Sequence, residues 1–459
     1  MQILARPLAP MRRGKPNTPS HSDTQAPRQA GAVPGRASGT STAPAWRGAQ
    51  TPPGEALGIY AKTDSAFSKP GPQIRWVPTD DDTGEVVAFE LRGTEWVPHK
   101  SQAQIRIERY RLKAVVNGFL PGSRVHKCHR WRVPTKTVQV MNSVEFNRAF
   151  YAGLQVCASV WLCPICAPKI SERRRVELKS GIDAWGHQGG RVLLLTLTVP
   201  HGLGDDLTAM LEQMLDAWRR TTTSRAGIAG RKQIGLKGTI RVLEVTHGRN
   251  GWHPHFHVLL FVNARHTLDQ VHQIMSPLWQ TACVKSGLPR PSDEHGVRVD
   301  GGERAASYAS KWGLEHEMTK GHLKRSKGPK GLTPWDMLRD YQETKSQRSR
   351  LLWMAYAGAF KGRRQLYWSN GLRKLLDVVD LDDAEIAAQK DDAAALLADL
   401  TDEQWRDVLL TRSEAALLEV AECQPGAIGA YLDGVTALAR AMGGVRPIIT
   451  DPKPQAVRA

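Results

Sequence analysis

The clearest hydrophobic pattern lies in the middle of the chain, where apolar residues are continuous or alternate with polar ones. Four segments have this character, which is typical of β-strands: Arg191–Val199, Gly238–Thr246, His255–Val262 and Gly296–Asp300. The residues between the second and third segments include His247-Gly-Arg-Asn-Gly251, which has the composition of a tight turn. Because the connection is so short, we expect these two strands to pair antiparallel.

Three segments between and after these strands have the spacing of apolar residues expected for helices: Leu207–Ser224, Thr267–Lys285 and Glu303–Glu317. The order is therefore strand, helix, strand, turn, strand, helix, strand, helix. This order predicts an α+β fold with a mainly antiparallel, ferredoxin-like sheet and helices on one of its faces.

The flanking segments are less regular. Residues 1–55 are rich in Pro, Gly, Ser, Thr and Ala and have few aliphatic residues, so we expect them to be disordered. Residues 56–125 are poorly defined, since runs such as Glu85–Leu91 and Ile105–Val116 fit short strands or a helix. Residues 377–445 have an acidic, Ala/Leu-rich helical pattern, and residues 446–459 are predicted to form a tail.

Charge is distributed unevenly along the 459 residues. The chain has 63 Lys+Arg against 45 Asp+Glu, a net charge of +18, which favours a polyanionic partner and nucleic acid in particular. Residues 377–422 alone contribute −11, so the remainder carries +29. The basic excess is dense in residues 320–375, with 14 Lys+Arg and three acidic residues.

Several protein classes are excluded by simple features of the chain. No apolar run approaches the ~18 residues that span a bilayer, and the basic N-terminus has no following apolar stretch, so neither membrane binding nor secretion is expected. Six cysteines are too few for a disulfide scaffold in a chain of this length. We therefore expect a protein of the reducing cytoplasm.

Two histidines mark the third predicted strand. Alternate side chains of a strand share a face, so His255 and His257 point the same way and could hold one divalent ion. Glu244 lies on the preceding strand and could supply a third ligand across the turn, leaving coordination positions open for a substrate oxygen. A carboxylate-containing set suits Mg²⁺ or Mn²⁺ in phosphate chemistry, although imidazoles also accept Zn, Co or Ni. The alternative is a strand with surface histidines. Pro254 is expected to turn His253 away.

A tyrosine and a lysine follow on the last predicted helix. Tyr308 and Lys311 are three residues apart and therefore share a face. A tyrosine hydroxyl has an unperturbed pKa of about 10, and a nearby ammonium favours the more nucleophilic phenolate. The alternative is a helix whose tyrosine packs into the core.

Four cysteines precede the strands. Cys163 and Cys166 have the spacing of a metal knuckle, and with Cys157 and Cys128 they could form a closed structural zinc site in a module at 126–180. His126 and His129 could substitute for Cys128, and the alternative is four thiols without metal. The two other cysteines of the chain are isolated and read as core thiols.

Taken together, three motifs resemble the HUH endonuclease superfamily, and most closely the replication initiators of rolling-circle plasmids. The motifs occur in this order: LLTLTVPH (194–201), VLEVTHGRNGWHPHFHVLLF (242–261) and SYASKWG (307–313). The WLCPICAPKI segment at 161–170 is also similar to such initiators. The resemblance covers roughly residues 190–320, which we take as the catalytic domain.

The resemblance implies a role for each matching residue. His255, His257 and Glu244 would hold Mg²⁺ or Mn²⁺, and Tyr308 would attack a phosphodiester of plasmid origin DNA. The products would be a 5′-phosphotyrosyl link and a 3′-OH that primes synthesis, and Lys311 would position the phosphate. The implied setting is the bacterial cytoplasm, with single- and double-stranded origin DNA and a host helicase as partners.

One position departs from the pattern of some relatives, which place a glutamate about one turn before the tyrosine to activate water. Here that residue is Arg304, so the motifs do not identify the residue that would activate water to end the cycle. A second tyrosine is not evident near Tyr308, which indicates a single-tyrosine enzyme. Two other functions fit the same motifs. One is a single-tyrosine transposase of a mobile element, and the other is a non-catalytic, zinc-containing DNA-binding regulator.

Basic residues outside these motifs are candidate DNA contacts. They lie beside the cysteines and in the segment 321–376 after the tyrosine. The residues are Arg173, Arg174, Lys324, Arg325, Lys327, Lys361, Arg363 and Arg364.

Overall fold

The computed structural model describes residues 102–144, 147–263, 266–311, 331–388 and 393–450, and the backbone alone of three earlier strands and of residues 310–311. The early strands are β1 (Ile74–Pro78), β2 (Val86–Arg92) and β3 (Glu95–Pro98), which form an antiparallel sheet in that order. Two units divide the chain at residues 52 and 53, and every described residue belongs to the second. The predicted disorder of residues 1–55 lies outside the described residues.

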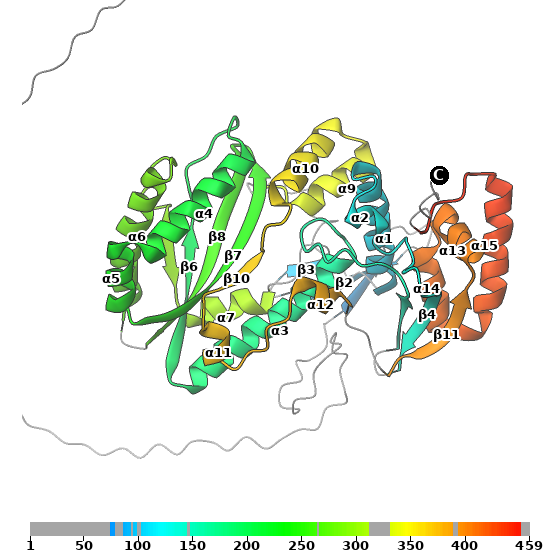
Figure 1. The fold of residues 1–459 in the computed structure, drawn as a ribbon, viewed down its shortest axis with the longest axis horizontal. Coiled ribbons are helices and arrows are strands. Elements are labelled where there is room, and N and C mark those ends of the chain that lie inside the picture. The colour runs from blue at the N-terminus through cyan, green and yellow to red at the C-terminus, as the bar shows by residue number, and fades with distance from the viewer. Residues whose placement is uncertain are drawn as a thin grey trace, which may run out of the picture. The chain divides into compact units, whose positions relative to one another are not determined.

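A five-stranded antiparallel sheet forms the centre of the fold, in the order β10-β7-β8-β6-β9 (Figure 1). The four predicted strands are confirmed, and a fifth joins them. Their bounds are β6 (Gly190–Leu197), β7 (Leu236–Gly248), β8 (Gly251–Asn263), β9 (Val297–Asp300) and β10 (Leu366–Trp368). Because β10 pairs with β7, the sheet extends past residue 320, the limit predicted for the catalytic domain.

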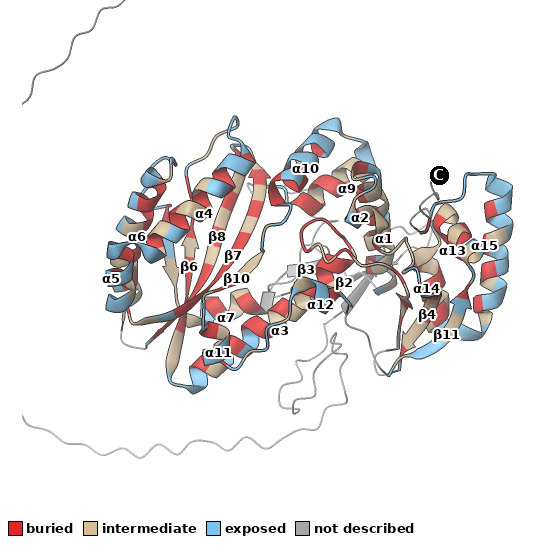
Figure 2. Ribbon diagram, viewed as in Figure 1, coloured by how far each residue is buried: buried red, intermediate tan, exposed pale blue. Residues whose placement is uncertain are grey.

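Helices cover both faces of this sheet, which corrects the prediction of helices on one face. Alternate residues of β6 enter different hydrophobic clusters: Leu193 and Leu195 pack with residues of α4 (Leu207–Thr223) and α6 (Leu268–Lys285), whereas Leu194 packs with α3 (Cys166–His187) and α7 (Gly302–Lys311). The central strands are apolar on both faces, so both need a cover. Figure 2 shows buried residues along these strands.

The helices around the sheet begin where the sequence supplies caps. The Asp206 side chain accepts a hydrogen bond from the Ala209 amide at the start of α4, and Thr267 and Gln270 form a capping box at the start of α6. A short helix missed by the apolar pattern, α5, follows α4. The remaining elements of this part are α1 (Gln102–Phe119), α2 (Arg124–Lys127), α5 (Arg225–Gln233), α9 (Pro334–Thr344), α10 (Gln347–Phe360), α11 (Leu372–Leu375) and α12 (Asp383–Ala388).

A second core unites residues from distant parts of the chain. Its three-stranded antiparallel sheet has the order β11-β4-β5. Strands β4 (Val138–Ser143) and β5 (Arg148–Ala152) lie between Cys128 and Cys157, and β11 (Ala395–Leu400) comes from the acidic segment. Residues 377–445, predicted as helical, therefore include a strand. The helices that pack here are α13 (Asp402–Thr411), α14 (Glu414–Cys423) and α15 (Ile428–Met442), with a 3-10 turn η2 (Pro425–Ala427).

None of the helices that the structure describes is both long and apolar enough to cross a membrane.

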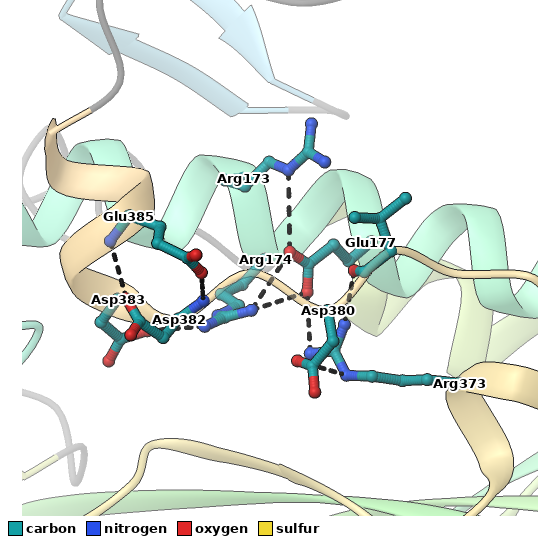
Figure 3. Close-up of polar contacts among 9 residues, drawn as sticks. Arg173, Arg174, Glu177, Arg373, Asp380, Asp382, Asp383 and Glu385 are labelled. Carbon is teal, nitrogen blue, oxygen red and sulfur yellow. Dashed lines mark hydrogen bonds and ion pairs between the residues drawn. The ribbon is translucent and has the colours of Figure 1, made fainter.

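An ion-pair network fastens the chain after the sheet onto α3 (Figure 3). The Glu177 carboxylate is almost fully buried and accepts contacts from Arg174 at 2.9 Å and from Arg373 at 3.1 Å. Arg174 also binds Asp383, at 2.7 Å. Charges this deeply buried are tolerated because each has partners of opposite sign.

Replacing Glu177 with glutamine should destabilise the protein by about 3 kcal/mol, because removing one partner leaves buried guanidinium groups without their carboxylate. Chemical denaturation followed by circular dichroism measures the change. Glu172→Gln is the matched control: Glu172 pairs with Arg175 on the same helix, but both side chains are about one-third exposed. The control should cost at most about 1 kcal/mol, and equal losses for the two variants would contradict the network's role.

Candidate active site

The site is built on the hairpin of β7 and β8. Arg249 and Asn250 form its two-residue loop, since Gly248 pairs with Gly251 across the ladder. Gly251 has φ +88°, and a Cβ there would lie 2.6 Å from the Gly202 carbonyl oxygen, so only glycine allows this close approach. The register places Glu244 directly opposite His255.

Glu244, His255 and His257 meet on one face of the sheet, with one ligand atom from each within 4.8 Å of the others. Both imidazole Nε2 atoms face the same carboxylate oxygen, at 3.3 Å from His255 and 3.7 Å from His257. Burial raises the pKa of the Glu244 carboxyl, but hydrogen bonding to His255 and the charges of both histidines outweigh it and lower the pKa to about 2. The carboxylate is thus ionised at neutral pH and suited to a cation.

The second ring nitrogen of His257 is also held. Its Nδ1 lies 3.0 Å from the Thr196 hydroxyl on β6. Burial lowers the pKa of His257 below its usual range, which favours the neutral imidazole that binds metals. Two imidazoles and a carboxylate, with Nε2 atoms directed to one point, fit a divalent cation such as Mg²⁺ or Mn²⁺.

Tyr308 reaches this group from α7. Ala305 and Ala309, both buried, seat the helix on the sheet and place Tyr308 beside it. The Tyr308 hydroxyl donates a hydrogen bond to Glu244 Oε1, and its ring centroid lies 4.7 Å from that of His257. The predicted metal residues and the predicted nucleophile are therefore adjacent. Lys311 is the last residue of α7, and its side chain lies outside the described residues.

His253 lies on the same face as the metal group, contrary to the expectation that Pro254 turns it away. Its ring stacks on His255 with centroids 5.1 Å apart, and its Nδ1 lies 3.5 Å from Nδ1 of His201. The alternation of β8 continues through Pro254 because the pairing with β6 reaches only to Phe256, so proline loses no ladder bond on that side.

Two charged residues, Asp300 and Arg304, lie close to the site in the chain, just before Tyr308. Asp300 on β9 carries a charge that raises the pKa of His257, a smaller effect than burial, and the motifs did not single it out. Arg304 is largely exposed, and its guanidinium lies 3.8 Å from the Asp300 carboxylate.

The four predicted cysteines come together in one buried cluster. Cys128, Cys157, Cys163 and Cys166 are free thiols, with Sγ–Sγ distances of 3.4 Å (128–166), 3.7 Å (128–163) and 3.8 Å (157–166). A tetrahedral zinc with Zn–S bonds of about 2.3 Å places its sulfurs about 3.8 Å apart, whereas a disulfide requires about 2.05 Å. The cluster fits a zinc ion, with Cys128 rather than either nearby histidine.

A family model described as "Replication protein" (Rep_1) matches residues 150–407. The chain belongs to this family. Among curated relatives, "Protein rep" of Streptomyces lividans is 28% identical over 63% of this chain and 81% of that protein. "Protein rep" of Staphylococcus aureus is 29% identical over 26% of this chain and half of that protein, and "Protein rep" of Streptococcus pneumoniae 35% identical over 22% and 32%. No solved structure gives a significant match.

The basic residues predicted to contact DNA differ in their surroundings. The Arg174 guanidinium is buried and is already bound by the carboxylates of Glu177 and Asp383, so the structure gives it a role within the protein. Arg173 lies 3.6 Å from Glu177 and is partly exposed, while Lys361 and Arg364 are exposed. Lys324, Arg325 and Lys327 lie outside the described residues.

Proposed function

We propose that this plasmid replication protein starts rolling-circle replication by nicking one strand of origin DNA through Tyr308 and later rejoins that strand. One observation carries the proposal: the Tyr308 hydroxyl donates a hydrogen bond to Glu244 within the His255/His257 group. We also propose that the five-stranded sheet has the HUH endonuclease fold and that the protein acts in the bacterial cytoplasm.

The chain's own residues account for orientation and proton handling. Glu244 holds the phenolic proton of Tyr308 and fixes where its oxygen points. The Tyr308 oxygen forms a bond to phosphorus as the bond to the 3′ oxygen breaks, and that oxygen takes a proton to become the 3′-OH. Glu244, His255 and His257 would hold Mg²⁺ or Mn²⁺, which supplies Lewis acidity toward the phosphate. The phosphotyrosyl bond retains the energy for rejoining.

The basic residues that remain available are proposed to hold the DNA. Arg173, Lys361, Arg363 and Arg364 are at least partly exposed, and their charge suits phosphates. The cysteine cluster is proposed to hold a structural zinc ion. The match to replication proteins favours an initiator over the transposase alternative.

Incubation of the protein with single-stranded origin DNA and Mn²⁺ tests the proposal. We expect a covalent protein–DNA adduct at the 5′ end of one product and a free 3′-OH on the other. His255→Ala should lower the rate of adduct formation by about a hundredfold or more, because a metal ligand is lost. EDTA should abolish the reaction. His295→Ala, an exposed histidine away from the group, is the control. A nick without an adduct would refute the tyrosine mechanism.

A further inference from the structure

Arg241 lies on β7 three residues before Glu244, and an odd separation along a strand places the two side chains on opposite faces. Its ladder partners are Val258 on β8 and Tyr367 on β10. Only 9% of the residue is exposed. A cation is thus buried on the face of the sheet that does not carry Tyr308.

This arginine differs from the other deeply buried arginines of the described chain. Arg339 is bound by Glu108 at 2.6 Å, and Arg174 by two carboxylates. Arg241 instead lies over two aromatic rings, 4.9 Å from the Phe256 centroid and 5.5 Å from that of Tyr367, and no described carboxylate pairs with it. Its Nε is enclosed without a hydrogen-bond partner. Burial lowers the pKa of Arg241 to about 10, yet it remains charged at neutral pH.

The strand next to Arg241 adds a second unsatisfied group. The Leu243 amide donates to the Gln365 carbonyl, so Gln365 lies opposite Leu243 and on the same face as Arg241. The side-chain oxygen of Gln365 is buried with no hydrogen-bond partner in the described structure. Because no described group binds this oxygen, the amide can turn its NH₂ group toward an incoming anion.

The residues just before β10 make the surroundings basic. Lys361, Arg363 and Arg364 lie between α10 and Gln365. Within the described residues, their acidic contact is Glu212 of α4, 3.6 Å from Arg363. A guanidinium, an adaptable amide and excess positive charge are the donors that recognise a phosphate group.

We propose that Arg241, with Gln365 and the basic residues before β10, binds a phosphate group of the origin DNA backbone on the sheet face away from Tyr308. The choice of DNA as the source rests on the proposed function. Arg241 and Glu244 are separated by only about 10 Å along β7, so one DNA molecule can contact both faces at the β10 edge of the sheet. The DNA phosphate completes the hydrogen bonds that the arginine lacks.

DNA affinity of the full chain, measured by fluorescence anisotropy over a salt series, tests this site. Arg241→Met keeps an unbranched side chain but removes the charge, and we expect about tenfold weaker binding of origin duplex with a salt slope lower by about 1. Cleavage of a single-stranded oligonucleotide at saturating protein is measured in parallel, so that a loss of DNA affinity is separated from a loss of the Tyr308 reaction. Arg440→Met, an exposed residue of α15, should bind as the wild type does.

Thermal unfolding without DNA provides the folding control. Arg241→Met should be at least as stable as the wild type, because it removes an unpaired buried charge. If it does not fold, Arg241→Lys serves instead, and it should bind DNA more weakly since a lysine cannot form the bidentate contact. Unchanged affinity and salt slope in the folded variant would overturn the proposal.

The alternative ligand for this site is free inorganic phosphate instead of a DNA phosphate. If inorganic phosphate raises the unfolding temperature of the wild type but not of Arg241→Met, while DNA affinity is equal in both, the DNA assignment is wrong. The same preparation of wild-type protein is also tested for nicking. If the wild type forms no covalent adduct, the proposed function fails; if it does, the binding results bear on the Arg241 site alone.

Discussion

Replacing Tyr308 with phenylalanine is expected to abolish the covalent adduct and to lower cleavage of origin DNA by at least about a thousandfold. The variant loses one oxygen atom, the atom that donates to Glu244 in the wild type. The ring remains, so its packing against His257 is preserved. Binding of origin DNA should stay within about twofold of wild type, because most affinity comes from phosphate contacts elsewhere.

Two controls make this result specific. Tyr431→Phe removes a hydroxyl from α15, in the second core, and should leave the adduct unchanged. Glu244→Gln keeps the shape of the carboxylate but removes its charge, so it should impair cleavage in Mn²⁺ while retaining Tyr308. If Tyr308→Phe cleaved and bound DNA normally, the protein would be a non-catalytic regulator, the third function considered from the sequence.

Replacing Cys163 with serine is expected to release bound zinc and to unfold the region around the cysteine cluster. Structural zinc sites bind with free energies on the order of 10 kcal/mol, and that energy is available only to the folded state. The cluster belongs to the same hydrophobic core as the central sheet, including Val160 and Ile170. Loss of zinc should therefore lower the unfolding temperature of the sheet as well as that of its own surroundings.

Zinc content by atomic absorption and unfolding by calorimetry measure the effect. The wild type should hold one zinc per chain, and acid should release it, since thiolate ligands are protonated as pH falls. Cys423→Ser is the matched control, because Cys423 is exposed and outside the cluster. If the wild type held no zinc and had four titratable thiols in the cluster, and if Cys163→Ser were as stable as the wild type, the cysteines would simply pack as a core.

The grouping of Glu244, His255 and His257 could be predicted from the sequence because these residues obey local rules. His255 and His257 alternate on one strand, and the short turn places Glu244 opposite His255, so the pattern of side chains alone predicts their meeting. The contact of Tyr308 with Glu244 bridges 64 residues and followed only from the resemblance to a known family.

Features that depend on tertiary partners were missed. Leu396 and its neighbours look helical in an Ala/Leu-rich segment, but pairing with β4 overrides that propensity and makes a strand. Arg174 sits in a run of three arginines that reads as a basic surface, and its carboxylate partner Asp383 lies 209 residues away. Arg241 appears as an ordinary polar position in an alternating strand, and only the structure reveals that it is buried without a carboxylate.

The pairing of β11 with β4 has a consequence for how the protein is made. About 250 residues separate Ser143 from Ala395, so the β4–β5 hairpin leaves the ribosome long before its third strand exists. At roughly 5–20 residues per second, that delay is about 12–50 s. During this interval the nascent chain exposes an open strand edge, which is prone to mispairing. The three-stranded sheet of this replication protein can therefore form only after nearly the whole chain has been synthesised. Translation products that end before β11 should aggregate rather than accumulate as soluble fragments.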